Sequence, residues 1–301
     1  MGASINVEGL VMTYGSLRAV DDISFAVGPG EFFGLLGPNG AGKTTTLETV
    51  EGLRKATAGR VDIDGFDPWK RQPELQRRIG VQLQASSFFE RLTAREQLST
   101  FAALYGIGPE RADELLEQVG LVEKAGDPVE KLSGGQKQRL SIACALVHDP
   151  EVLFLDEPTA ALDPQSRRNL WDFLQGLNDS GRTVVLTTHY MEEAETLCDR
   201  VAIIDHGRIL ELDTPDALIR GLDVPTRISL EPEAIGLDEA RALPGALDVQ
   251  QTAGSVVIET REPGPLLAEL ASRDALAGLA VSKGTLEDVF LSRTGREYRE
   301  S

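Results

Sequence analysis

Apolar and polar residues alternate along the first part of the chain, through INVEGLVMTY and then DDISFAV, which predicts half-buried antiparallel strands. Gly28, Pro29 and Gly30 form a turn signal before EFFGLL, a short apolar run typical of a buried strand. A glycine-rich loop follows, residues Lys43–Leu53 have the pattern of a helix, and GRVDIDG returns to strand. This stretch predicts antiparallel β-structure that leads into one buried strand.

The middle of the chain changes to helical spacing. Segments such as LTAREQLSTFAALYG and RADELLEQVG place apolar residues three and four apart, which predicts a helical subdomain over about residues 85–147. Two β-rich apolar runs follow, VLFLDEP and TVVLTTH, with a helix predicted between them over Arg167–Leu177. Strands that alternate with helices indicate a parallel sheet with crossover connections. The run VAIIDHGRILEL closes this part as a hairpin.

The chain has 301 residues, enough for about two domains. After Arg220 the segment GLDVP has the composition of a linker, and short strand and helix patterns alternate beyond it. We therefore predict an α/β domain over residues 1–220 and a small α+β domain over residues 221–301.

Charge and composition argue against nucleic-acid binding, a membrane-spanning helix, secretion and a zinc cluster. Lys and Arg total 30 against 48 Asp and Glu, a formal net charge of −18, which makes nucleic acid an improbable partner. No apolar run approaches the roughly 18 residues of a membrane helix, and the first residues lack the pattern of a signal peptide, so we expect a cytoplasmic chain. Cys144 and Cys198 are too few for a zinc cluster and are expected to be buried thiols.

A phosphate-binding loop is the most specific motif in the chain. GPNGAGKT matches G-x-x-x-x-G-K-[ST] between a predicted strand and a predicted helix. Glycines let successive backbone N–H groups turn toward a phosphate at the helix N-terminus, Lys43 can reach the β- and γ-phosphates, and the Thr44 hydroxyl can bind Mg²⁺. The residues expected to bind nucleotide here are Gly37, Pro38, Asn39, Gly40, Ala41, Gly42, Lys43, Thr44 and Thr45.

Two adjacent carboxylates end the apolar run VLFLDE, where parallel sheets present their ligands. Asp156 suits the metal ion. Glu157, at the end of the strand, can turn toward the water that attacks the γ-phosphate and act as its general base. An acidic pair alone is common, but after a phosphate-binding loop it predicts a hydrolase site.

The segment LSGGQ opens an amphipathic helix between these two motifs, with Ser133 and Gly135 at its start. A helix N-terminus binds anions, although the string alone also fits an ordinary capped helix. Taken together, the three motifs make the chain resemble the ATP-binding subunit of an ATP-binding cassette (ABC) transporter over residues 4–220. The resemblance implies a P-loop NTPase cassette: a RecA-like parallel-sheet core, an antiparallel β-subdomain and a helical subdomain.

The resemblance also implies how such chains work. Two cassettes sandwich two ATP molecules with Mg²⁺, so Ser133 and Gly135 would act across a homodimer. Tyr14, 37 − 14 = 23 residues ahead of the loop, resembles the aromatic that stacks on adenine. His189, after the strand TVVLTT, resembles the histidine that holds the γ-phosphate and the attacking water, so that Lys43, Glu157 and His189 form the expected catalytic set.

Two further positions follow from the same resemblance. Gln84 is similar to the glutamine that contacts Mg²⁺ and senses the membrane partner, which would give Thr44, Gln84 and Asp156 as the metal-binding residues. Gln82 faces the same side of a strand, and composition does not choose between the two glutamines. Asp163 in ALDP resembles the residue that links the two sites of the dimer.

The C-terminal segment GTLEDVFLSRTGREYRE is similar to the ending of bacterial ATPases of the daunorubicin-exporter group. This implies an exporter subunit at the cytoplasmic face of the cell membrane, working with separately encoded permease subunits on a drug-like or lipid-like molecule. An importer subunit is the alternative. A cassette ATPase acting on nucleic acid is a weaker one, because the chain is acidic and lacks long insertions.

Overall fold

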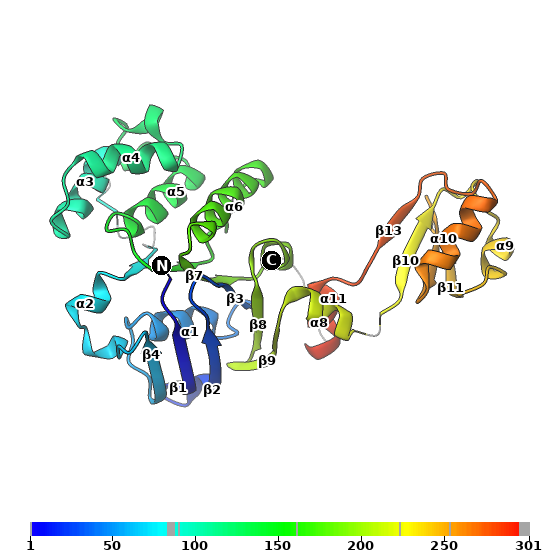
Figure 1. Ribbon diagram of the computed structural model, residues 1–301, viewed down its shortest axis with the longest axis horizontal. Coiled ribbons are helices and arrows are strands. Elements are labelled where there is room, and N and C mark those ends of the chain that lie inside the picture. The colour runs from blue at the N-terminus through cyan, green and yellow to red at the C-terminus, as the bar shows by residue number, and fades with distance from the viewer. Residues whose placement is uncertain are drawn as a thin grey trace. The chain divides into compact units, whose positions relative to one another are not determined.

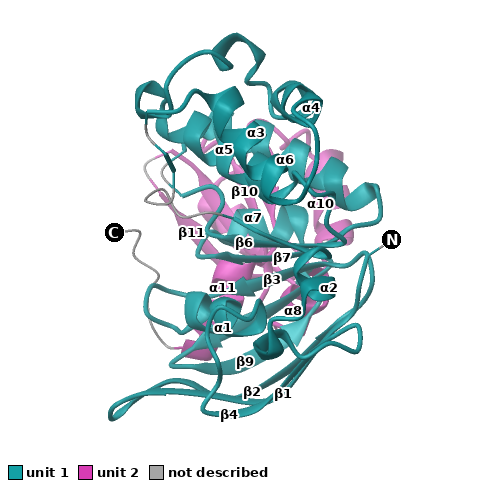
Figure 2. Ribbon diagram, turned by 90° about the vertical axis from the view of Figure 1, so that its left-hand side faces the viewer, with its two compact units in different colours: residues 1–215 teal, residues 216–301 magenta. Residues whose placement is uncertain are grey.

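The computed structural model of the chain describes residues 2–82, 88, 89, 91–160, 162–222, 224–252 and 254–294. The chain divides into two compact units, Met1–Pro215 and Asp216–Ser301, coloured separately in Figure 2. The division falls after Pro215, ahead of the expected boundary at residue 220.

A six-stranded sheet forms the core of the first unit, in the order β5-β6-β7-β3-β8-β9. All pairs are parallel except β8 with β9, which form the predicted hairpin. All five residues of β3 and all six of β7 are buried, as expected for strands covered on both faces. The strands are β3 (Phe32–Leu36), β5 (Ile79–Val81), β6 (Val152–Asp156), β7 (Thr183–Thr188), β8 (Arg200–Asp205) and β9 (Arg208–Asp213).

A three-stranded antiparallel sheet, in the order β2-β1-β4, lies beside this core (Figure 1). Its strands are β1 (Ile5–Tyr14), β2 (Leu17–Val27) and β4 (Ala58–Ile63). Helix α1 (Lys43–Val50) buries Leu47 and Val50 in one apolar cluster that takes side chains from both sheets. This shared core fixes the start of α1 against the ends of the central strands.

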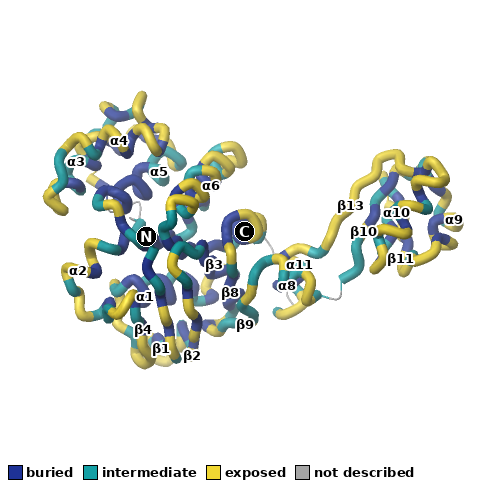
Figure 3. The backbone as a smooth tube through the Cα atoms, viewed as in Figure 1, coloured by how far each residue is buried: buried dark blue, intermediate teal, exposed yellow. Residues whose placement is uncertain are grey.

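Helices α3 (Ala94–Leu104), α4 (Glu110–Gln118) and α5 (Gly134–Ala145) make up the predicted helical region, after the short helix α2 (Pro73–Gln76). A capping box between Thr93 and Glu96 begins α3. Most of the apolar positions spaced at three and four, among them Leu98 and Leu115, are buried, whereas Leu104 at the end of α3 is exposed. Figure 3 shows the exposed outer sides of these helices. Short 3-10 helices cover Pro68–Lys70, Val122–Lys124 and Val129–Lys131.

Two helix boundaries differ from the sequence prediction. The helix expected over Arg167–Leu177 is α6 (Pro164–Asp179), because the Asp163 side chain accepts hydrogen bonds from the first free N–H groups and a proline occupies the first turn. The helix expected to reach Leu53 ends at Val50, and Gly52 follows with a φ of 86°. Helix α7 (Met191–Leu197) follows β7.

The second unit contains a four-stranded antiparallel sheet in the order β11-β12-β10-β13, with one helix in each of two crossovers. One face of β10 and β12 packs under α9 and α10 in a separate apolar cluster that includes Ile228, Ile258, Leu266 and Leu270. Helix α8 (Pro215–Gly221) begins at the last residue of the first unit. The elements that follow it are β10 (Thr226–Leu230), α9 (Leu237–Arg241), β11 (Ala246–Gln251), β12 (Val256–Thr260), α10 (Pro263–Ser272), β13 (Ala280–Ser282) and α11 (Leu286–Thr294).

The two faces of β12 should differ sharply in their effect on stability. We expect Ile258→Ala to lower the free energy of opening of β10 and β12 by about 2–5 kcal/mol, since Ile258 is fully buried and the change leaves a cavity. Val257→Ala, on the opposite face, should cost under about 1 kcal/mol. Amide hydrogen exchange of the full chain measures both, and equal effects would contradict this assignment of faces.

Candidate active site

The phosphate-binding loop joins β3 to α1 and requires glycine at two positions. A Cβ atom on Gly37 would lie 2.1 Å from the Ile204 carbonyl oxygen, and one on Gly42 would lie 2.4 Å from that of Ala19. Gly42 also has a φ of 104°, a backbone conformation that other residues adopt only with strain. The backbone therefore turns tightly between neighbouring segments, as a loop that wraps a phosphate must.

The ammonium group of Lys43 is held inside this loop. Its side chain is only 4% exposed, and Nζ donates hydrogen bonds to the carbonyl oxygens of Gly37 at 2.8 Å and Pro38 at 3.1 Å. Nζ also lies 3.2 Å from Oε1 of Glu157. A cation fixed at the centre of a glycine loop is positioned for an anionic ligand.

One oxygen of Asp156 joins three elements. Oδ1 accepts a hydrogen bond from the Thr44 hydroxyl of α1 at 3.0 Å and from the Thr187 hydroxyl of β7 at 2.5 Å. Asp156 and Thr187 are partners in the parallel register of β6 and β7. The sequence predicts Asp156 and Thr44, but it gives no signal for Thr187, whose run TVVLTTH fits any buried strand.

Glu157 lies between two other predicted residues. Its Oε1 faces Lys43, and its Oε2 lies 3.2 Å from Nδ1 of His189. The backbone of Glu157 is left-handed, with a φ of 45°, and its N–H points to the carbonyl oxygen of Thr187 at 3.2 Å and to the Thr187 hydroxyl at 3.0 Å. Strained backbone of this kind persists only where its surroundings hold it, and it is common at functional sites.

The donor atoms at this edge fit Mg²⁺. No group of three His, Cys, Asp or Glu side chains among the described residues could by itself hold a metal. Mg²⁺ is a hard cation that takes one or two protein oxygens together with substrate phosphates. The hydrogen-bonded oxygen pair of Thr44 and Asp156, next to the phosphate-binding loop, is such a set.

Ser133 and Asp163 each begin a helix. The Ser133 hydroxyl and the Gln136 side chain form a capping box at the start of α5, while Asp163 caps α6. Hydrogen bonds, first among them that from the Ser166 side chain, hold the pKa of Asp163 below its usual range. A Cβ on Gly135 would lie 3.1 Å from Leu162, so the two helix starts are close, but no hydrogen bond of the described residues joins them to the phosphate-binding loop.

Of the remaining predicted residues, Tyr14 lies at the end of a strand and Gln84 is not among the described residues. Tyr14 ends β1 with 41% of its surface exposed and Arg54 5.8 Å from its ring centre. Gln82, the alternative glutamine, donates from Nε2 to the carbonyl oxygen of Asp156 at 3.3 Å, which places it beside β6.

Both cysteines are buried, as predicted. Burial raises the pKa of each thiol, so neither has the character of a reactive nucleophile.

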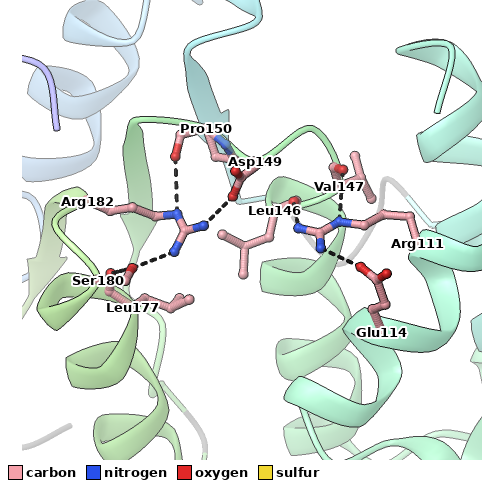
Figure 4. A network of polar contacts seen from close by, with 9 residues as sticks. All are labelled: Arg111, Glu114, Leu146, Val147, Asp149, Pro150, Leu177, Ser180 and Arg182. Carbon is pink, nitrogen blue, oxygen red and sulfur yellow. Dashed lines mark hydrogen bonds and ion pairs between the residues drawn. The ribbon is translucent and has the colours of Figure 1, made fainter. Parts of the chain in front are cut away.

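The turn between α5 and β6 connects the LSGGQ helix to the strand of Asp156, and two arginines hold it from opposite sides (Figure 4). Arg111 of α4 donates to the carbonyl oxygens of Leu146 at 3.2 Å and Val147 at 3.3 Å. Arg182, just before β7, donates to the Pro150 carbonyl oxygen at 3.2 Å and pairs with Asp149. The sequence gives no sign of this clamp, because its partners are far apart along the chain.

The chain is similar to curated transporter subunits over nearly its whole length. It is 38% identical to the linearmycin resistance ATP-binding protein of Bacillus subtilis, over 98% of this chain and all of that protein. It is 41% identical to the Nod factor export ATP-binding protein I of Ralstonia nicotianae, over 98% of this chain and 95% of that one. A family model described as ABC transporter matches residues 20–160.

Solved structures agree on the fold. An ATP-binding subunit of an ABC transporter superposes with a TM-score of 0.65 at 28% identity, over 72% of this chain and 92% of that one. A dimeric ATP-binding cassette in a post-hydrolysis state, bound to ADP and phosphate, superposes with a TM-score of 0.64 at 29% identity, over 70% and 98%. Among the described residues no helix is both long and apolar enough to span a membrane. With its phosphate-binding loop, its paired carboxylates and these relatives, the chain belongs to the ABC transporter family, as an ATP-hydrolysing, ATP-binding subunit.

Proposed function

We propose that this chain drives export of a drug-like or lipid-like molecule through a separately encoded membrane permease, with Glu157 as the general base for ATP hydrolysis. The observation that carries the catalytic assignment is the position of the Glu157 carboxylate, between the ammonium group of Lys43 and the ring of His189. A base in this position has a cation on one side and a group that can orient water on the other.

The residues of the site have separate roles in the proposed reaction. Lys43 exchanges its contact with Glu157 for a phosphate oxygen, which frees the carboxylate to accept a proton from the attacking water. His189 holds the water and the γ-phosphate. Thr44 and Asp156, with Gln84 as the expected third residue, would hold Mg²⁺, which neutralises charge on the β- and γ-phosphates when bound. Tyr14 stacks on the adenine ring.

A second copy of the chain completes the site. Ser133 and Gly135 stand at the N-terminus of α5, where backbone N–H groups suit an anion, and we assign them to the nucleotide held by the partner copy. Asp163 begins α6 close to that helix start and links the two sites. The dimeric cassette among the similar structures supports this arrangement.

A groove of about 620 Å³ between the central sheet and the helices suits contact with the permease. Its lining includes Leu53 and Leu104, which are 61% and 75% exposed and leave apolar surface available. Glu51 lies in the same lining, where burial and the neighbouring Glu48 and Asp156 raise its pKa to about 8. A groove that is largely uncharged at neutral pH suits an apolar helix of a membrane partner.

The names of the relatives support export rather than import as the direction of transport. One is named for linearmycin resistance and another for Nod factor export, and the resemblance extends to the C-terminal segment. The word resistance in the first name supports a drug-like cargo, and an exporter subunit of this kind would work at the cytoplasmic face of the membrane.

We expect Glu157→Gln to lower ATP hydrolysis by about 10²–10⁴-fold, because the amide cannot accept the proton of the attacking water. ATP binding should remain, and the variant should accumulate as an ATP-bound dimer in size-exclusion chromatography. The matched control is Glu192→Gln, on the exposed side of α7, which should hydrolyse normally. Normal hydrolysis by Glu157→Gln would refute the assigned base.

Lys43→Ala should instead weaken nucleotide binding by about 10–100-fold, the value of a lost charge-assisted contact with phosphate. Direct titration with a fluorescent ATP analogue measures this. Lys55→Ala removes an exposed lysine near the end of the same helix and should bind like the wild type. Equal affinity of both variants would contradict a phosphate contact by Lys43.

The permease can be tested by purifying tagged Glu157→Gln protein from native membranes with ATP present and identifying its partners by mass spectrometry. Recovery of a multi-span membrane protein encoded beside this chain is the expected result. Reproducible recovery of soluble proteins or nucleic acid alone would leave the ATPase in place and overturn the export assignment. A periplasmic binding protein encoded in the same operon would indicate import.

A further inference from the structure

Tyr190 follows the proposed catalytic histidine in the chain and packs against it. The ring centres of His189 and Tyr190 lie 4.1 Å apart, with the two planes tilted by 39°. Side chains of consecutive residues in an extended segment point to opposite sides, so this contact needs a turn in the backbone. The Tyr190 N–H donates to the hydroxyl of Thr188 at 3.0 Å, which closes a turn of this kind after β7. No step of the proposed reaction uses Tyr190.

The guanidinium group of Arg167 contacts the same ring from α6. Its Cζ atom lies 4.1 Å from the centre of the Tyr190 ring, well within the roughly 6 Å at which an aromatic face attracts a cation. Nε of Arg167 is buried and has no hydrogen-bond partner among the described residues. Burial raises the pKa of Glu193 and the charge of Arg167 partly offsets this, so the guanidinium also lies near that carboxyl group. Arg167 is thus held against the ring.

The proposed reaction depends on the orientation of the His189 ring. Nδ1 lies 3.2 Å from Oε2 of Glu157, so the other ring nitrogen, Nε2, points elsewhere. The side chain is 19% exposed and can turn about two single bonds, and a contact at one edge of the ring does not by itself fix its plane. The Tyr190 ring, packed against His189, restricts that rotation.

The same arginine ties this arrangement to the start of α6. The Arg167 N–H donates to the carbonyl oxygen of Asp163 at 2.9 Å, in the first turn of the helix. The side chain that contacts Tyr190 is therefore one turn away from the residue expected to link the two sites of a dimer. A displacement of this helix start would reach His189 through two side-chain contacts, that of Arg167 with Tyr190 and that of Tyr190 with His189.

We propose that Tyr190 is a positioning residue for ATP hydrolysis: its ring, held by Arg167, fixes the orientation of His189. The inference rests on the proposed function, in which His189 holds the γ-phosphate and the attacking water. Tyr190 touches neither of these itself, and its hydroxyl has no part in the role. Position 190 therefore requires an aromatic ring and position 167 a cation.

Variants of the two side chains test this role in the full chain. Tyr190→Leu removes the ring and leaves Arg167 beside Glu193, so we expect kcat to fall by about 10-fold while ATP affinity stays within about twofold of the wild type. Tyr190→Phe keeps the ring and should retain most of kcat. Arg167→Met removes the charge and should lower kcat by about 3–10-fold, whereas Arg167→Lys should restore most of it. Arg168→Met, at the exposed next position, is the matched control and should hydrolyse ATP normally.

A double-mutant cycle separates positioning from a general loss of structure. In a His189→Ala background the ring has nothing to orient, so Tyr190→Leu should lower kcat by no more than about twofold further. Losses that multiply would overturn the proposal, as would a folded Tyr190→Leu variant with wild-type kcat or a Tyr190→Phe variant as slow as Tyr190→Leu. If Tyr190→Leu does not fold, Arg167→Met in the same two backgrounds decides by the same criterion.

His189→Ala alone tests the assignment on which the proposal rests. We expect it to lower kcat by about 10²–10³-fold, the loss typical of one donor aimed at the transition state. Full activity of this variant would remove the proposed role of His189 and the proposal with it. A slow His189→Ala variant beside a fully active Tyr190→Leu variant would leave the proposed function in place and overturn only the role of Tyr190.

Discussion

A single oxygen of Asp156 receives hydroxyl hydrogen bonds from Thr44, 112 residues earlier in the chain, and from Thr187, 31 residues later. This junction exists only because β3, β6 and β7 run parallel and end at one edge of the sheet. It ties the start of α1 to two strands, so the phosphate-binding loop cannot shift without disturbing the acidic pair. The contact of Lys43 with Glu157 and that of Glu157 with His189 both lie next to this fixed point.

Local patterns predict the parts of the site that are contiguous in the chain. The phosphate-binding loop, the acidic strand end and the capped start of α5 each combine a strand or helix signal with residues whose chemistry is unambiguous. The convergence of the first two also follows, because the carboxyl ends of parallel strands meet at one edge. Helix ends are less predictable where a capping side chain decides them. Asp163 caps α6, so the helix begins at Pro164, before the apolar pattern of the sequence begins.

Residues whose contacts are with distant parts of the chain leave no local signal in the sequence. Thr187 lies in a run of β-branched residues that any buried strand would contain. Glu193 stands in the acidic stretch MEEAETL, which fits a solvated helix face, and α7 has only seven residues, too few for periodicity to separate its buried carboxyl from the exposed Glu192 and Glu195. The edge strand β13 is three residues long and exposed throughout, so no alternation marks it.

The clamp formed by Arg111 and Arg182 makes the two ends of α5 unequal. Its C-terminal end is tied into the turn that leads to β6, whereas its N-terminal end carries Ser133. Twelve helical residues form a rigid rod about 18 Å long. If the rod pivoted at the tied end by about 10°, Ser133 would move by about 3 Å while Asp156 stayed in place. Because Arg139 of α5 also donates to the carbonyl oxygens of Val119 and Gly120, such a rotation would carry the end of α4 with it, and the start of the LSGGQ helix would move together with the helical region rather than alone.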